Sequence, residues 1–64
     1  MTVQEAITML ETHGWRECRV EGDLRLFRHA DQPGIVTLSG KLEFEVPRGA
    51  LKSLRRYALK EEDG

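Results

Sequence analysis

Few side chains in this sequence could carry out chemistry, and their spacing restricts what that chemistry could be. The chain holds one cysteine and two histidines, Cys18, His13 and His29. They lack the paired spacing of a zinc site, and there is no glycine-rich phosphate loop, so we expect neither a metal nor a cofactor. A lone cysteine cannot form an intramolecular disulfide, which favours a reducing compartment. We expect Cys18 to pack as a small hydrophobic residue.

Basic side chains form a second group, because they can bind phosphate. Residues 24–60 hold eight basic and three acidic residues, whereas residues 1–23 hold two basic and five acidic ones. The net charge of −1 gives no overall attraction to a polyanion, but a local basic surface can still bind one. The alternative is that these residues form solvated faces of the fold. The candidates are Arg25, Arg28, Lys41, Arg48, Lys52, Arg55 and Arg56.

The stretch 22–38 predicts the hairpin around which the chain is organised. Residues 24–29 and 35–38 have strand character, and 30–34, ADQPG, contain turn residues. A lone hairpin is marginally stable in water, so its apolar face needs a cover. A preceding strand over 15–20 would complete an antiparallel meander. Its expected faces are Arg16, Cys18 and Val20 on one side and Trp15, Glu17 and Arg19 on the other.

Two helices are predicted to supply the cover. The first spans 3–12, with the apolar stripe Val3, Ala6, Ile7 and Leu10 and a capping box from Thr2 to Glu5. Gly14 suits a left-handed position after it, and Trp15 is expected in the core. The second spans 47–60, with Pro47 at its first position. Its inner stripe is expected to be Ala50, Leu51, Leu54, Tyr57 and Ala58.

The predicted fold class is therefore α+β, in the order α-β-β-β-α, with a three-stranded antiparallel sheet and both helices on one face. A chain of 64 residues supports one domain, 1–64, with 61–64 as a frayed tail. In the loop before the second helix, Leu42 or Phe44 should anchor the chain to the core. No apolar run approaches the roughly 18 residues of a membrane span, so we expect a cytoplasmic protein and no membrane partner.

Taken in order, these features make the sequence similar to the HicA-type toxins, small partners of HicB-type antitoxins in prokaryotes. The resemblance covers roughly residues 3–58. It includes Gly14-Trp15, Gly22 before the hairpin, Phe27-Arg28-His29 and Pro33-Gly34. It continues through Gly40-Lys41 and 46–54, VPRGALKSL, which resemble the family's Gly-Lys loop and its Pro-x-Gly-Thr-Leu-x-Ser-Ile-Leu helix. It implies a fold like the double-stranded-RNA-binding domain and an RNA partner.

The resemblance also implies metal-independent cleavage of mRNA, centred on a histidine in a Gly-Ser-His motif. The matching residues here are Gly22, Asp23 and Leu24, and a leucine cannot accept a proton. His29 lies five residues further along, roughly 16 Å away on the opposite strand face. Arg25 remains protonated, and the charge of Asp23 would repel the phosphate. We therefore predict no catalytic residue by the family mechanism.

Three hypotheses follow from the sequence. The chain is an RNA-binding HicA-like protein whose cleavage of mRNA is weak or absent and which pairs with a HicB-type antitoxin. Alternatively, it is an active endoribonuclease that uses another base. The third possibility is a partner-binding module without RNA function.

Overall fold

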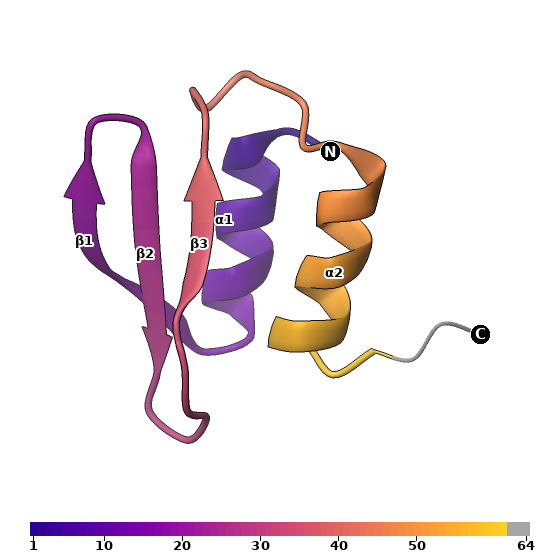
Figure 1. Ribbon diagram of the computed structural model, residues 1–64. Helices are drawn as coiled ribbons and strands as arrows, with labels where there is room; N and C mark the ends of the chain where they lie inside the picture. The colour runs from indigo at the N-terminus through magenta and orange to yellow at the C-terminus, as the bar shows by residue number, and fades with distance from the viewer. Residues whose placement is uncertain (62–64) are drawn as a thin grey trace.

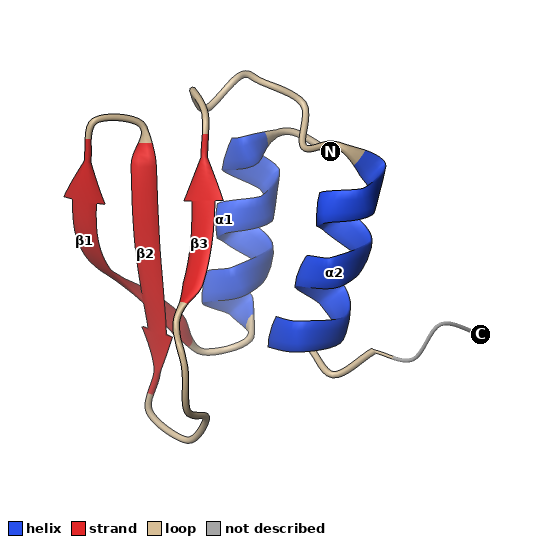
Figure 2. Ribbon diagram, in the orientation of Figure 1, coloured by secondary structure: helices blue, strands red, loops and turns tan. Residues whose placement is uncertain are grey.

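The computed structural model describes residues 1–61 and has the element order α-β-β-β-α (Figure 1). Helix α1 covers Val3–Thr12, strands β1, β2 and β3 cover Trp15–Glu21, Leu24–His29 and Val36–Ser39, and helix α2 covers Arg48–Ala58. The strands form one antiparallel sheet in the order β1-β2-β3 (Figure 2). The predicted α+β fold is confirmed. Of the expected frayed tail, 62–64 lie outside the described residues, and the N–H of Glu61 donates to the Arg55 carbonyl.

Both helices pack against the same face of the sheet, as predicted. Trp15 and Phe27 are fully buried at its centre. The indole N–H of Trp15 donates to the carbonyl of Ala58 at 3.1 Å and so joins the start of β1 to the end of α2. The remaining buried members of this core are Ala6, Leu10, Val36, Leu38, Leu54 and Ala58. The inner face of the sheet is therefore the one that carries Trp15 and Phe27.

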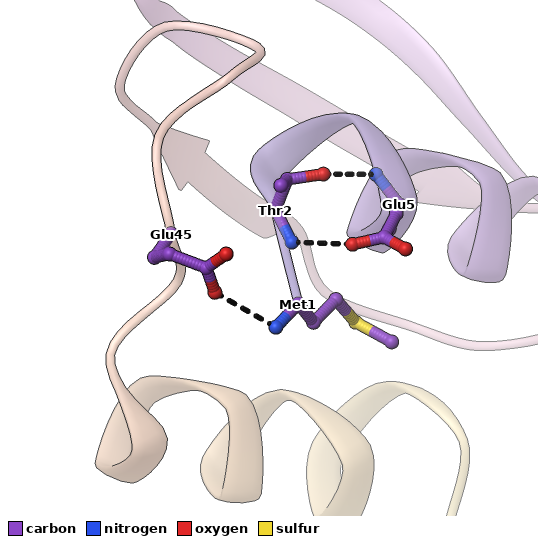
Figure 3. Close-up of polar contacts among 4 residues, drawn as sticks. All are labelled: Met1, Thr2, Glu5 and Glu45. Carbon is purple, nitrogen blue, oxygen red and sulfur yellow. Dashed lines mark hydrogen bonds and ion pairs between the residues drawn. The ribbon is translucent and has the colours of Figure 1, made fainter.

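The start of α1 is held by polar contacts on two sides (Figure 3). The predicted capping box is present: Thr2 accepts from the Glu5 N–H, and the Glu5 carboxylate accepts from the Thr2 N–H at 2.8 Å. The N–H bond from Thr2 lowers the pKa of Glu5, so the box stabilises the fold above the unfolded pKa of this carboxyl and weakens as the pH falls through its folded value. The Met1 ammonium pairs with Glu45 at 2.9 Å.

The loop from β3 to α2 is anchored differently from the prediction. Leu42 and Phe44 are 38% and 52% exposed, so neither is the expected core anchor. Their carbonyls instead accept from the N–H groups of Gln4 and Val3, at 3.0 and 2.8 Å. Val46 supplies the apolar contact with the core. Backbone bonding to the unpaired N–H groups of the first turn of α1 therefore replaces side-chain burial.

Strand β1 contains a bulge that the sequence pattern did not reveal. Glu17 pairs with Phe27 and Arg19 with Leu26, so Cys18 is an extra residue on β1. The faces predicted beyond it are wrong, because Val20 now lies on the inner face and Arg19 on the outer one. Cys18 is exposed, which contradicts its expected packing as a small hydrophobic residue.

The ends of the last two elements also differ from prediction. Strand β3 begins at Val36 rather than Ile35, and α2 ends at Ala58 rather than residue 60. Pro47 is the N-cap residue and not the first helical one. On α2 only Leu54 and Ala58 are buried, whereas Tyr57 of the expected inner stripe is half exposed. Ala50 is also exposed, and Leu51 is half-buried.

Candidate nucleic-acid interface

Helix α2 gathers four of the predicted basic residues on one face. The first three lie at intervals of four and three residues, about one helical turn each, and the fourth directly follows the third. The opposite face buries Leu54 and Ala58, so the basic face points away from the core. The four are Arg48, Lys52, Arg55 and Arg56, and all are exposed.

The first turn of α2 has an electrostatic character suited to an anion. It contains no acidic residue, and its N-cap residue, Pro47, makes no side-chain hydrogen bond to it. The N–H groups at a helix start carry a partial positive charge, and here Arg48 adds a full one. Basic side chains and helix dipole therefore have the same sign at this end of the helix.

The other three predicted residues do not join this face. Lys41 is exposed in the loop between β3 and α2, and this loop lies at the end of the molecule where α2 begins (Figure 1). Arg28 is exposed on the outer face of the sheet, opposite to the helices, because its neighbour Phe27 points inward. Arg25 lies on the inner face, where its guanidinium bonds to Glu17 at 2.8 Å and its buried Nε has no hydrogen-bond partner among residues 1–61.

Leu24, the position implied for the family's histidine, lies on the outer face of the sheet. It is half-buried, and its cross-strand neighbours are Glu21 on β1 and Ser39 on β3. Asp23 belongs to the turn just before it. The side chain at position 24 is thus accessible from the face that the helices leave open, and it is aliphatic.

His29 has a structural role in the described fold. Its Nδ1 accepts from the Asp31 N–H at 2.9 Å, so the proton of the neutral ring resides on Nε2, which donates to the His13 carbonyl at 2.9 Å. The ring also packs edge-on against Trp15, with centroids 5.2 Å apart. The His29 side chain lies on the inner face of the sheet. This placement is expected because side chains alternate between faces and His29 is five residues from the outer-face Leu24. Both ring nitrogens are therefore already engaged.

Glu21 is a candidate catalytic base that the sequence did not reveal. Its carboxylate lies across from Leu24 on the outer face and pairs with Arg19 at 2.5 Å, and both side chains are more than half exposed. The signal was absent from the sequence because the bulge at Cys18 decides which β1 residues share a face with Leu24. Glu21 is the carboxylate that register places beside position 24.

The geometry defines a small α+β domain with the element order α-β-β-β-α, a three-stranded antiparallel sheet and a basic last helix. The sequence model described as "HicA toxin of bacterial toxin-antitoxin" matches residues 3–61, nearly the whole chain. The chain therefore belongs to the HicA toxin family, a family of toxins from toxin–antitoxin systems, and the resemblance in the sequence is confirmed. None of the curated proteins compared with the chain matches it significantly.

The described part of the chain holds neither a metal-ligand cluster nor a membrane-spanning helix. Over residues 1–61, histidine, cysteine and carboxylate side chains nowhere gather in threes as metal ligands would. Neither α1 nor α2 has the length and apolar character that a membrane-spanning helix requires.

Proposed function

We propose that this HicA-family protein binds RNA through the basic face of α2 and that its cleavage of mRNA is weak or absent. The observation that carries the proposal is the contrast between two surfaces. The basic face of α2 carries four exposed cationic side chains and begins at a helix start without a side-chain cap. The outer sheet face carries Leu24 where the family mechanism needs a base.

RNA binding is favoured by the kind of contact that this surface offers. Double-stranded RNA is recognised mostly through phosphates and 2′-hydroxyls, which need basic side chains at set spacings rather than base-specific pockets. Arg48 and the first turn of α2 offer one phosphate contact, and Lys52, Arg55 and Arg56 extend it along the helix. Lys41 lies at the same end of the molecule and would add a contact beside Arg48.

The weak or absent cleavage follows from the lack of a positioned base. His29 uses both ring nitrogens for the fold, and Arg25 pairs with Glu17 on the other face of the sheet. Asp23 precedes Leu24 in a turn and carries a charge that would repel phosphate. A HicB-type antitoxin is the protein partner that this function implies.

RNA binding is tested by the salt dependence of the affinity for a short RNA duplex. The affinity should fall steeply as salt rises, because bound phosphates release counterions. Arg55→Ala/Arg56→Ala should weaken binding and reduce the slope of log K against log[salt] by about two. The matched control Arg16→Ala/Arg19→Ala removes the same charge from the start and middle of β1 and should leave the slope unchanged. Equal slopes in all three proteins would favour a module without RNA function.

Cleavage is tested by induction in a bacterial host, with growth and mRNA integrity as readouts. The wild type should cause little arrest, and Leu24→His should create or raise toxicity, since imidazole accepts protons near neutral pH. Glu21, across the strand pair, would lie beside the new ring. An unchanged phenotype for folded Leu24→His would show that the catalytic position lies elsewhere.

A second candidate function, an active endoribonuclease with another base, is favoured by one observation. Glu21 and Arg19 place a carboxylate and a guanidinium together on the outer face beside position 24. If the wild type arrests growth and degrades mRNA, and Glu21→Gln abolishes both, this second function replaces the first. Glu45→Gln, which changes an exposed carboxylate far along the chain, is the control.

A further inference from the structure

The free edge of β3 carries unpaired backbone groups. The N–H of Gly40 donates to the Asp23 carbonyl at 3.2 Å. Hydrogen-bonded and non-hydrogen-bonded residue pairs alternate along an antiparallel ladder, so this bond determines which residues of β3 bond to β2. The N–H and C=O groups of Val36 and Leu38 therefore point to β2. Those of Thr37 and Ser39 point away from the sheet, and no described residue bonds to them. An extended segment could pair with these two residues.

An apolar groove lies beside this edge. It is about 340 Å³ in volume, runs between β3 and α2, and is lined by Ile35, Val46, Ala50, Leu54 and Tyr57 among others. Ile35 is 41% exposed and Tyr57 is 50% exposed, so the groove has apolar surface to bury. A strand added to β3 would place alternate side chains over this groove.

The other edge of the sheet has protections that β3 lacks. Strand β1 has a bulge at Cys18 and charged residues on both sides of it, and natural proteins use these devices to prevent edge pairing. Strand β3, with the sequence VTLS, has neither a charge nor a bulge. Strand β3 is therefore the edge of the sheet that remains open to pairing.

Positive charge marks one end of the groove. Ser53 and Tyr57, which line the groove, also line a second hollow with Arg56 and Lys60. Strand β3 runs toward the start of α2, as Figure 1 shows, so an antiparallel partner strand would run toward the end of α2. Its C-terminal residues would reach Arg56 and Lys60, where carboxylates would be favoured.

We propose that β3 and this groove bind an extended segment of a partner protein as a fourth, antiparallel strand. The segment has apolar residues at alternate positions and carboxylates at its C-terminal end. A second copy of this chain fits less well. Two-fold pairing would bring the Arg56–Lys60 end of one copy to the Lys41–Arg48 end of the other, with like charges. The inference adds a docking site to the proposed function and depends on neither RNA binding nor cleavage.

The test uses the ¹⁵N-labelled full chain and a capped synthetic peptide of alternating threonine and valine that ends in two glutamates. The amide signals of Thr37 and Ser39 should shift on titration, and their hydrogen exchange should slow. Ile35→Asp should weaken binding at least about tenfold, because it removes apolar area and adds a like charge. Val20→Asp is the matched control on the other edge, where Val20 is 47% exposed, and should bind within about twofold of the wild type.

Three results would overturn the proposal. One is the absence of shifts at Thr37 and Ser39 at millimolar peptide, and another is an equal loss of affinity in both variants. The third is a concentration-dependent dimer of the free chain that protects the same two amides, which would make a second copy the occupant. A peptide ending in two lysines, or carrying a central proline, should not bind. RNA affinity plays no part in these readouts, so a failure here leaves the proposed function standing.

Discussion

The two edges of the sheet differ in almost every respect that matters for association. Strand β1 begins at the fully buried Trp15, contains a bulge at Cys18 and carries four charged residues among its seven. Strand β3 is four residues long, uncharged and regular, and it faces an apolar groove. The bulge and the charged side chains of β1 both oppose pairing at that edge, whereas β3 has neither.

The difference teaches where the stability of this small fold is concentrated. The start of β1 and the turn before it are held by hydrogen bonds from Trp15 to the Ala58 carbonyl, from His29 to the His13 carbonyl and from Arg16 to the Glu11 carbonyl. The start of β3 follows the exposed Ile35 and contacts α2 mainly across a groove. We therefore expect substitutions on the β1 side to destabilise the fold more, and those on the β3 side to alter association more.

The largest effect should come from Trp15→Ala. It removes a fully buried aromatic ring and its hydrogen bond to Ala58, so the free energy of unfolding should fall by about 3–5 kcal/mol. Val36→Ala, the matched truncation at the start of β3, should cost about 1–2 kcal/mol. Urea unfolding followed by circular dichroism measures both. Equal losses would remove the asymmetry on which the comparison rests.

A pair of glycines sharpens the same comparison at the turns that lead into the two edge strands. Gly14 has φ +93°, and a Cβ there would lie 2.7 Å from Nε2 of the firmly held His29. Gly34 has φ +90°, and its Cβ would meet the hydroxyl of the half-exposed Tyr57, which can swing away. Both alanine variants carry left-handed strain of about 1–2 kcal/mol. Gly14→Ala should lower the free energy of unfolding by about 1 kcal/mol more than Gly34→Ala does, because His29 must move.

The control for this pair is Gly22→Ala, at φ +59° with open space around the added methyl group. Its loss of stability should come from backbone strain alone and should therefore equal the loss in Gly34→Ala. If Gly34→Ala lowers the free energy of unfolding most of the three, Tyr57 is held more firmly than its exposure indicates. The β3 side would then adapt no more easily to an added methyl group than the β1 side.

A smaller effect is expected from the inner-face ion pair next to β1. Glu17→Gln leaves the half-buried Arg25 without its carboxylate, and its Nε is already unpartnered, so stability should fall by about 1 kcal/mol. Glu21→Gln breaks the exposed Arg19–Glu21 pair and should lower the free energy of unfolding by much less than Glu17→Gln does. The measurement is the urea midpoint at low and at 1 M salt. A larger loss for Glu21→Gln would mean that the outer face of β1 contributes more than the inner one.

The sequence predicted the framework well because the framework depends on local signals. The capping box at Thr2, the stripe of α1, Gly14 and the hairpin turn at 30–34 each have a signature within a few residues. Four of the seven candidate basic residues were expected on the second helix outside its inner stripe, and helical spacing alone determines that they are exposed there.

The misses arose where several segments meet. The bulge at Cys18 depends on how β1 and β2 pair, and WRECRV contains no glycine that would mark it. The inner-face position of Arg25 follows from its pairing with Val20 and from the burial of Phe27 two residues on, and helical or strand spacing alone does not assign that face. Leu42 or Phe44 was expected to anchor the loop 39–45 to the core, and the loop bonds to the start of α1 through its backbone instead. Which β1 residue faces Leu24 follows from the register, and no single-segment pattern contains it.

The smallest effect should come from Cys18→Ser, which tests the bulge itself. If Cys18 is the extra, outward residue of β1, exchanging its exposed thiol for a hydroxyl should change the free energy of unfolding by less than about 0.5 kcal/mol. In the folded wild type, a thiol reagent such as Ellman's should react fully without denaturant. A thiol that reacts only after unfolding, together with a loss above 1 kcal/mol, would mean that β1 pairs without the bulge. Val20 and Glu21 would then exchange faces, and the outer-face neighbour of Leu24 would no longer be a carboxylate.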